Sequence, residues 1–430
     1  MSIRDLRSSP PRFAYCALLV ALLSGAAAID AQSPEWPQWG GITRDFKTNA
    51  KGLASSWPDG GPRRLWTRPL GEGYSSIAVD NGTLYTMYRK GNQDVVIALA
   101  AATGKTIWEH SYDAPFIVAG RDAEIVKEYH LENGTGPAST PLIVGESLFA
   151  VGPTGIFHSL NKKTGKVIWQ HKFITELQGY IRQRGYAVSP LAYKDTVIMP
   201  VGAVGASVVA FSQKDGSIVW KKNDFRHAYA SPFIIDVDGQ EQLVLFMETE
   251  IIGIDPNNGD LLWMHPANPQ GTNVSTPVWG DGNLLFASAS YGYGGHGFKL
   301  TRSGGQTRIE EVWANNRVRL HFANAMRIGN VIYGSSGDFG PAFFTALDAQ
   351  TGKILWQDRR LSRASFLYAD GRFIMIDEDG KLVLASPTPE GLTIHSQVEL
   401  LTHNAWTVPT LVGKTLYVRD RKVIMALDLS

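Results

Sequence analysis

The chain has 430 residues, of which 44% are hydrophobic and 19% are charged, with Lys+Arg 41 against Asp+Glu 40. This composition is typical of a globular protein, and the balanced charge excludes a bulk attraction for nucleic acid, so we expect no nucleic-acid partner. The single cysteine, Cys16, excludes an internal disulfide and a cysteine-based zinc site.

Residues 1–31 are predicted to be a Sec-type signal peptide. A positively charged, arginine-containing region precedes "FAYCALLVALLSGAAA", an apolar run that ends in small residues. Cleavage is expected after Ala28 or Ala31, and Cys16 is badly placed to carry a lipid. We therefore expect a periplasmic or secreted protein, not a lipoprotein, without a membrane span after cleavage; an uncleaved anchor is the alternative.

A lead-in segment is expected at residues 32–62, and a repeated pattern follows it. Five segments share one frame: "ALAAATGKTIW", "SLNKKTGKVIW", "AFSQKDGSIVW", "GIDPNNGDLLW" and "ALDAQTGKILW". In each, a glycine lies four residues before a tryptophan, which is typical of a hairpin whose turn needs a positive φ. We interpret the tryptophans as packing residues rather than reactive ones. The predicted repeat tryptophans are Trp66, Trp108, Trp169, Trp220, Trp263, Trp313 and Trp356.

Each hairpin is preceded by two more apolar strands, which begin at a Ser/Thr/Val-x-Pro-like motif, as in "STPLIVGESLFAV" and "VSPLAYKDTVIMPV". Four antiparallel strands in roughly 40 to 50 residues form the blade of a β-propeller. We predict an all-β fold, an eight-bladed β-propeller of four-stranded antiparallel blades over residues 63–430; seven blades are the alternative. An eighth copy places His395 in the tryptophan position. The N-terminal "PRRLWTRPL" is expected to complete the last blade and close the ring.

The frame "ALD-x-x-TGK-x-x-W" resembles the repeat of the pyrroloquinoline-quinone-like β-propeller family. That family includes quinoprotein dehydrogenases and the non-catalytic lipoprotein propeller of the outer-membrane β-barrel assembly machinery. The resemblance covers about residues 36 to 430 and implies the fold more strongly than the function, because its motif residues are packing residues. Quinoprotein dehydrogenases carry a vicinal cysteine pair beside the quinone, which a single cysteine excludes here, so the resemblance implies the non-dehydrogenase branch.

The sequence favours an exported, non-catalytic binding or scaffold propeller, and it leaves catalysis open. The alternative is a divergent quinone-dependent oxidoreductase without the cysteine pair, for which pyrroloquinoline quinone and calcium would be the cofactors. A hydrolase or lyase is the third hypothesis. Under the first hypothesis, the non-catalytic propeller, we expect no cofactor and no metal site. We also expect a monomer that binds a protein partner or a small anionic ligand.

The residues just before each innermost strand are expected to converge on one funnel mouth. Because arginines and histidines outnumber acids there, we predict a mildly basic, aromatic-edged binding site. The insert at residues 109–140 could hold a short helix over this mouth. The candidate mouth residues are Glu72, Tyr74, Asn133, Arg184, Tyr186, Arg226, His227, Asn273, His296, His321, Arg363, His403, Asn404 and Trp406.

Overall fold

The computed structural model describes residues 35–115, 127, 130, 132–338 and 340–430. The predicted signal peptide with its proposed cleavage sites lies outside the described residues, and so does most of residues 116–131, where a helix was expected. Of this insert, residues 127, 130, 132 and 133 are described and helical. Residues 34–430 form one compact unit.

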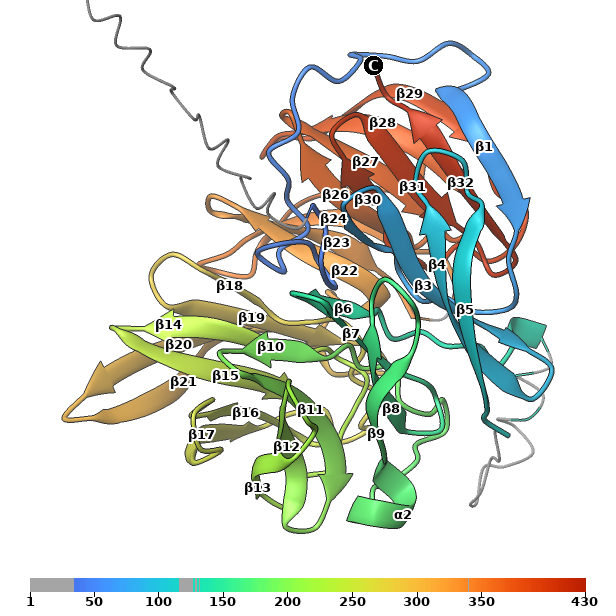
Figure 1. Cartoon of the computed structure of the whole chain (residues 1–430). Helices are drawn as coiled ribbons and strands as arrows, with labels where there is room; N and C mark the ends of the chain where they lie inside the picture. The colour runs from blue at the N-terminus through green and yellow to red at the C-terminus, as the bar shows by residue number, and fades with distance from the viewer. Residues whose placement is uncertain (1–34, 116–126, 128–129, 131, 339) are drawn as a thin grey trace, which may run out of the picture. The chain divides into compact units, whose positions relative to one another are not determined.

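The described residues form eight antiparallel sheets of four strands each (Figure 1). Blade 1 contains β2 (Ala78–Asp80), β3 (Thr83–Lys90), β4 (Gln93–Ala100) and β5 (Thr106–Asp113). Blade 2 contains β6 (Leu142–Val144), β7 (Ser147–Val151), β8 (Ile156–Asn161) and β9 (Val167–Lys172), which is followed by α2 (Phe173–Leu177). Blade 3 contains β10 (Leu191–Tyr193), β11 (Thr196–Ala203), β12 (Ala206–Ser212) and β13 (Ile218–Lys222). Blade 4 contains β14 (Phe233–Val237), β15 (Gln240–Phe246), β16 (Glu250–Ile254) and β17 (Leu261–Pro266).

Four more blades complete the propeller. Blade 5 contains β18 (Val278–Gly280), β19 (Leu284–Ala289), β20 (Gly294–Ser303) and β21 (Gln306–Asn315). Blade 6 contains β22 (Leu320–Ile328), β23 (Val331–Ser336), β24 (Phe343–Asp348) and β25 (Ile354–Asp358). Blade 7 contains β26 (Ala364–Ala369), β27 (Arg372–Asp377), β28 (Lys381–Pro387) and β29 (Leu392–Glu399). Blade 8 contains β30 (Thr410–Val412), β31 (Thr415–Arg419), β32 (Val423–Asp428) and, from the start of the chain, β1 (Arg63–Pro69).

The ring closes as predicted, with eight blades. Strand β1 pairs antiparallel with β32, so the N-terminal strand is the outermost strand of the last blade (Figure 1). An ion pair between Arg63 Nη2 and Asp428 Oδ2, 2.6 Å apart, lies at one end of this pairing. The closure pairs the edge of β32, which would be exposed without β1.

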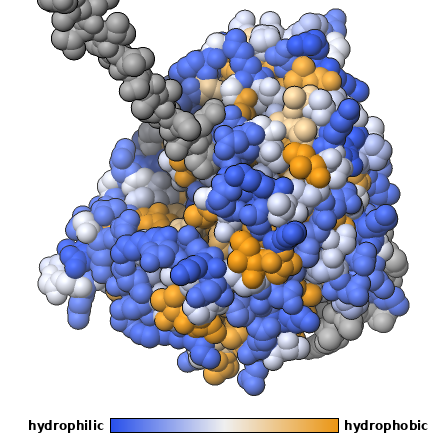
Figure 2. Space-filling view, in the orientation of Figure 1, coloured by the Kyte–Doolittle hydropathy of each residue, from blue (hydrophilic) through white to orange (hydrophobic). Residues whose placement is uncertain are grey.

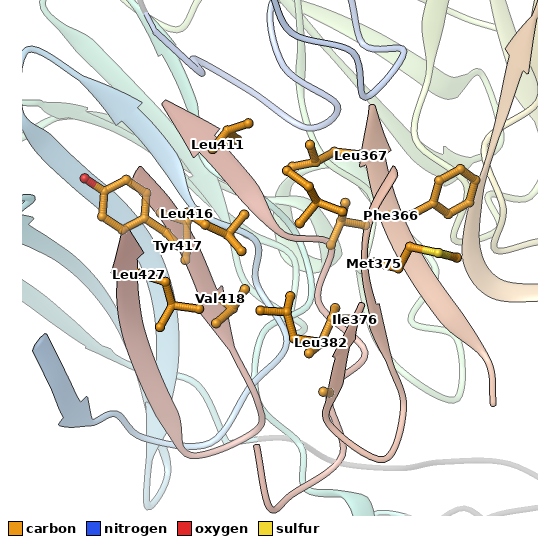
Figure 3. Packing of buried hydrophobic residues seen from close by; sticks show 14 of the residues in the cluster. Phe366, Leu367, Met375, Ile376, Leu382, Leu411, Leu416, Tyr417, Val418 and Leu427 are labelled. Atoms are coloured by element: carbon orange, nitrogen blue, oxygen red, sulfur yellow. The ribbon is translucent and has the colours of Figure 1, made fainter. Parts of the chain in front are cut away.

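Apolar side chains fill the space between neighbouring blades. Figure 3 shows this packing between blades 7 and 8. Side chains of β26 to β28 face those of β30 to β32, and all belong to one buried cluster. Phe366 and Met375 point to the other side of blade 7, where Phe366 contacts Phe344 of blade 6, and Tyr417 points away from blade 7 and contacts Trp66. The other labelled residues are Leu367, Ile376, Leu382, Leu411, Leu416, Val418 and Leu427. The face in Figure 2 is mainly hydrophilic, with small separate apolar patches.

The repeat tryptophans lie on the outermost strands, opposite small residues of the adjacent strand. Trp108 lies opposite Ala98, and Trp263 opposite Gly253, next to a bulge that shifts the register. In blade 7 the residue opposite Ala385 after the equivalent bulge is Ile394. In the other seven blades the tryptophan is paired and the residue before it is the unpaired bulge residue, whereas in blade 7 His395 itself is unpaired, between Ile394 opposite Ala385 and Ser396 opposite Leu384. The prediction that His395 occupies the tryptophan position is therefore wrong, and His395 is exposed.

Side chains at the starts of the inner strands link one blade to the next. The Ser189 hydroxyl accepts the backbone N–H of Thr140 at 3.0 Å, and the Ser231 hydroxyl accepts that of Ser189 at 3.0 Å. Both serines belong to the Ser-x-Pro-like motif of the repeat. The serine of this motif therefore accepts a hydrogen bond from a backbone N–H of the preceding blade.

The lead-in segment packs against the inner strands of several blades. Trp36 pairs with Val79 of β2, and the Ile143 N–H donates to the Pro37 carbonyl at 2.8 Å. On other blades, Trp39 Nε1 donates to Thr276 Oγ1 at 3.3 Å. Further along, Leu53 and Ala54 bond to Asp370 and Leu429, next to turns on the face opposite the mouth. The segment before β1 is thus part of the folded unit.

Candidate functional site

A pocket of about 150 Å³ lies among the loops that precede the inner strands. Within each blade the chain reverses three times, so these loops share one face with the turns between the second and third strands. We call this face the mouth. The mouth pocket is lined by Trp39, Tyr74, His130, Asn133, Gly134, Thr135, Gly136, Ala138, Arg184, Ala187, Ser189, Tyr229, Ser231, Val274, His321, Phe322 and Trp406.

One wall of the mouth pocket is aromatic. The rings of Tyr74 and Trp406 stack with centroids 4.8 Å apart and an angle of 27°. Phe322 lies 4.9 Å from Trp406 at an angle of 42°. Tyr74 precedes the first blade and Trp406 precedes the last, so this wall depends on ring closure. Trp39 adds a further ring from the lead-in segment.

Another part of the lining of the mouth pocket is polar. Arg184 lines it, and His321 Nε2 is 2.8 Å from the Tyr291 hydroxyl. Burial, with the nearby positive charges of Arg184 and Arg363, lowers the pKa of His321 to about 4. His321 is therefore neutral at pH 7. Its Nδ1 atom is buried and has no hydrogen-bond partner among the described residues.

The loop of residues 132–136 forms part of the pocket wall and is tied to the first and last blades. The Tyr74 hydroxyl donates to the Asn133 carbonyl at 2.7 Å, and Asn404 Nδ2 donates to Asn133 Oδ1 at 2.8 Å. Gly136 passes so close to Glu72 that an added Cβ would lie 2.1 Å from the Glu72 carbonyl oxygen. These contacts fix the end of the insert, and only glycine fits at position 136.

The structure brings five of the predicted mouth residues together in the pocket: Tyr74, Asn133, Arg184, His321 and Trp406. Three others support the fold. The Tyr186 and His227 rings are buried and stack 4.4 Å apart, and the two His227 nitrogens each lie 2.8 Å from a backbone carbonyl oxygen, of Ala228 and Tyr180, so the neutral ring donates to one of them. Burial lowers the pKa of His227. Buried Asn273 donates to the Met247 carbonyl.

The remaining predicted residues lie outside the pocket lining, and most are paired with charged groups. Arg363 contacts Glu378 at 2.6 Å, and Arg226 lies 3.9 Å from Glu248. His403 is 3.4 Å from Asp420. The mouth is therefore less basic than expected, because carboxylates from the turns between second and third strands lie beside the cations.

Two more predicted residues have partners of their own. Glu72 contacts Arg421 at 3.0 Å. His296 does not line the pocket: it stacks on Tyr293 at 4.1 Å and is 2.9 Å from Glu311 of the outer strand β21. Its position as third residue of β20 directs it along the blade rather than toward the axis.

Sequence reasoning missed several pocket residues. Trp39 lies in the lead-in motif "WPQWGG", which gives no sign that it folds back onto the axis. Phe322 follows His321 at the start of blade 6 and could have been found by including both neighbours of each predicted position. The carboxylates that pair with the mouth cations, Glu248, Glu378 and Asp420, lie outside the pocket lining. They could have been found by applying the same reasoning to the turn between the second and third strands of each blade.

Within the residues that the structure describes, no group of three or more His, Cys, Asp or Glu side chains is placed to hold a metal ion. The same residues include no helix that is long and apolar enough to cross a membrane.

Eight four-stranded blades, a closing N-terminal strand and glycine–tryptophan hairpins define a propeller of the pyrroloquinoline-quinone-like class. The family described as outer membrane protein assembly factor BamB matches residues 54–223 and 133–358. The chain belongs to this family.

Individual relatives agree with this membership. BamB of Yersinia pestis is 23% identical over 367 residues, covering 84% of this chain and 76% of the relative. A quinoprotein alcohol dehydrogenase of Pseudomonas putida is 28% identical over 149 residues, covering 31% of this chain and 24% of the enzyme.

Solved structures show the same fold. BamB from Moraxella catarrhalis has a TM-score of 0.57 and 16% identity, covering 85% of this chain and 99% of that chain. A quinohemoprotein alcohol dehydrogenase from Pseudomonas putida HK5 has a TM-score of 0.64 and 11% identity, and the match covers 92% of this chain and 80% of the enzyme.

Proposed function

We propose that this protein is an exported, non-catalytic scaffold in outer membrane protein assembly and that it holds a partner at the mouth. Family membership supports a role in outer membrane protein assembly, since the relatives are named as assembly factors. The observation that carries the binding role is the mouth pocket, whose aromatic wall and polar side come from several different blades. Concave sites lined by aromatic rings with a few polar groups are typical of ligand recognition.

The test is a gene deletion in the native host, with outer-membrane protein abundance measured by quantitative mass spectrometry. We expect the deletion to lower the abundance of outer-membrane proteins and the full-length gene to restore it. A Tyr74→Ala/Trp406→Ala variant should restore it poorly. Ile107→Ala, which alters an exposed apolar residue on the outer strand β5, is the matched control and should restore it fully. Unchanged abundance after deletion would contradict the proposal.

The local similarity to a quinoprotein alcohol dehydrogenase keeps one alternative, a quinone-dependent oxidoreductase. The described residues fit that cofactor poorly: those that line the pocket include no Asp or Glu, so calcium beside a quinone would lack carboxylate ligands among them. Incubation of the purified protein with pyrroloquinoline quinone and calcium, followed by gel filtration and absorbance spectroscopy, separates the two. We expect no chromophore to travel with the protein; a stoichiometric chromophore would favour the oxidoreductase.

A further inference from the structure

The mouth pocket has two chemically different sides within the reach of one amino-acid residue. The aromatic side offers the faces of Tyr74, Trp406 and Phe322, which suit a planar ring through offset or edge-on contacts. The polar side offers the Arg184 guanidinium and the His321 ring. A ligand that satisfies both sides carries a ring next to a hydrogen-bond acceptor.

The polar side favours an acceptor with negative charge. The Tyr291 hydroxyl lies 2.8 Å from His321 Nε2. When this hydroxyl donates its hydrogen to Nε2, the neutral ring carries its own hydrogen on Nδ1, which has no acceptor among the described residues. Arg184 lies close enough to affect the ionisation of His321. A carboxylate beside both groups would accept hydrogen bonds from a guanidinium and from an imidazole N–H, and charge-assisted bonds of this kind are the stronger ones.

The recognition surface continues outside the pocket, in which Trp39, held to Thr276, is one of the lining residues. On the same face, Arg226 lies over the Tyr180 ring at 4.9 Å, and these side chains are 61% and 42% exposed. A ligand that contacts both the mouth pocket and the Arg226–Tyr180 pair is longer than a single aromatic ring with a single carboxylate.

We propose that the mouth pocket receives an aromatic side chain from an extended segment of a partner protein, while the carboxylate of an adjacent acidic residue binds Arg184 and His321. This inference rests on the proposed scaffold function and names the chemistry of the partner. The exposed Arg226–Tyr180 pair then contacts the flanking part of the same segment.

The test uses the purified mature protein and three synthetic hexapeptides, followed by isothermal titration calorimetry. The probe is acetyl-Gly-Ser-Asp-Phe-Gly-Ser-amide; one control replaces its Phe with Ala, and the other replaces its Asp with Asn. We expect measurable binding of the probe that weakens as salt rises, and about tenfold weaker binding of each control. Phenylacetate is the fourth ligand and should bind more weakly than the probe.

Protein variants locate the binding. Arg184→Gln and His321→Gln should each weaken probe binding by about tenfold. Arg64→Gln, an exposed arginine on the outer strand β1, is the matched control and should leave binding unchanged. Circular dichroism melts confirm that each variant is folded.

Equal binding of the Phe-to-Ala control, or probe binding that Arg184→Gln leaves unchanged, would overturn the inference. Phenylacetate binding as tight as the probe would also overturn it, in favour of a small-molecule site. If no peptide binds while the gene deletion still lowers outer-membrane protein abundance, the inference fails and the scaffold function stands. If the probe binds and the deletion has no effect, the scaffold function fails instead.

Discussion

Trp108 of blade 1 docks on Gly165 in the hairpin turn of blade 2. Its Nε1 donates to the Lys162 carbonyl at 2.9 Å, and a Cβ on Gly165 would lie 2.5 Å from the indole. Trp66 has the same relationship to Gly104, with a 2.8 Å bond to the Ala101 carbonyl. The repeated glycine and tryptophan therefore link neighbouring blades, in addition to forming a hairpin within one blade.

Replacing Gly165 with alanine should destabilise the protein by about 1 to 3 kcal/mol, because the new methyl group overlaps the Trp108 ring and φ is +70°. Gly145→Ala is the matched control: its φ is +55°, and nothing lies within 4 Å of the added Cβ. Gly145→Ala should lower the free energy of unfolding, measured by equilibrium urea unfolding, by less than Gly165→Ala does. Equal losses for the two variants would mean that backbone strain, not docking on Trp108, determines the glycine.

The tryptophan position can be tested separately in blades 2 and 7. Trp169 is buried and its Nε1 donates to the Gln213 carbonyl, so Trp169→Ala should cost about 3 to 5 kcal/mol of unfolding free energy. His395 is exposed, so His395→Ala should change stability by less than about 0.5 kcal/mol. Urea unfolding followed by fluorescence and circular dichroism measures both. A large loss for His395→Ala would restore His395 to the tryptophan position.

The sequence was sufficient to predict the eight blades because the pattern is local and repeats. A turn glycine and an outer tryptophan recur in one frame, and "PRRLWTRPL" was identified as the missing fourth strand of blade 8. The error at His395 arose because the bulge, which precedes the tryptophan in the other blades, falls on His395 itself in blade 7, and a linear alignment does not show where a bulge falls. Trp356 is half-buried rather than buried, since burial also depends on the neighbouring blade.

The candidate site was harder to predict because it combines loops whose lengths differ. Position within the repeat placed Tyr74, Arg184 and His321 on one face, and these line the pocket. The same reasoning could not distinguish them from Tyr186, which is equally close to its strand but turns into the core. Trp39 belongs to no repeat, so only the folded chain shows its place on the axis.

Ring closure should depend on β1 and not on the earlier part of the lead-in. Deleting residues 32–70 removes β1, exposes the edge of β32 and should produce an aggregating protein. Deleting residues 35–58 keeps β1 and should leave a soluble protein of lower stability that lacks Trp39 in its pocket. Size-exclusion chromatography and thermal unfolding distinguish the two. A soluble, cooperatively unfolding 32–70 deletion would contradict the closure.

Stability should fall as the pH falls from about 6.5 to about 4, in part because of His321. The pKa of His321 is about 4 in the folded protein, since burial and the charges of Arg184 and Arg363 disfavour its protonated form, although Asp338 opposes them. An unfolded histidine titrates near pH 6.5, so the unfolded chain binds the proton first as acid is added. The contribution of His321 is therefore fully present above about pH 6.5, is lost between about 6.5 and 4, and changes no further below.

The His321→Gln variant isolates this contribution, because glutamine does not titrate in this interval. Its unfolding free energy should fall less steeply than that of the wild type, by at most about 1.4 kcal/mol per pH unit. Ile107→Ala is the matched control, since it replaces an exposed residue that does not titrate and should leave the slope between pH 6.5 and 4 at the wild-type value. Urea unfolding at half-unit steps of pH measures all three proteins. Parallel curves for wild type and His321→Gln would show that His321 does not stay neutral in the folded mouth pocket as the pH falls from 6.5 to 4.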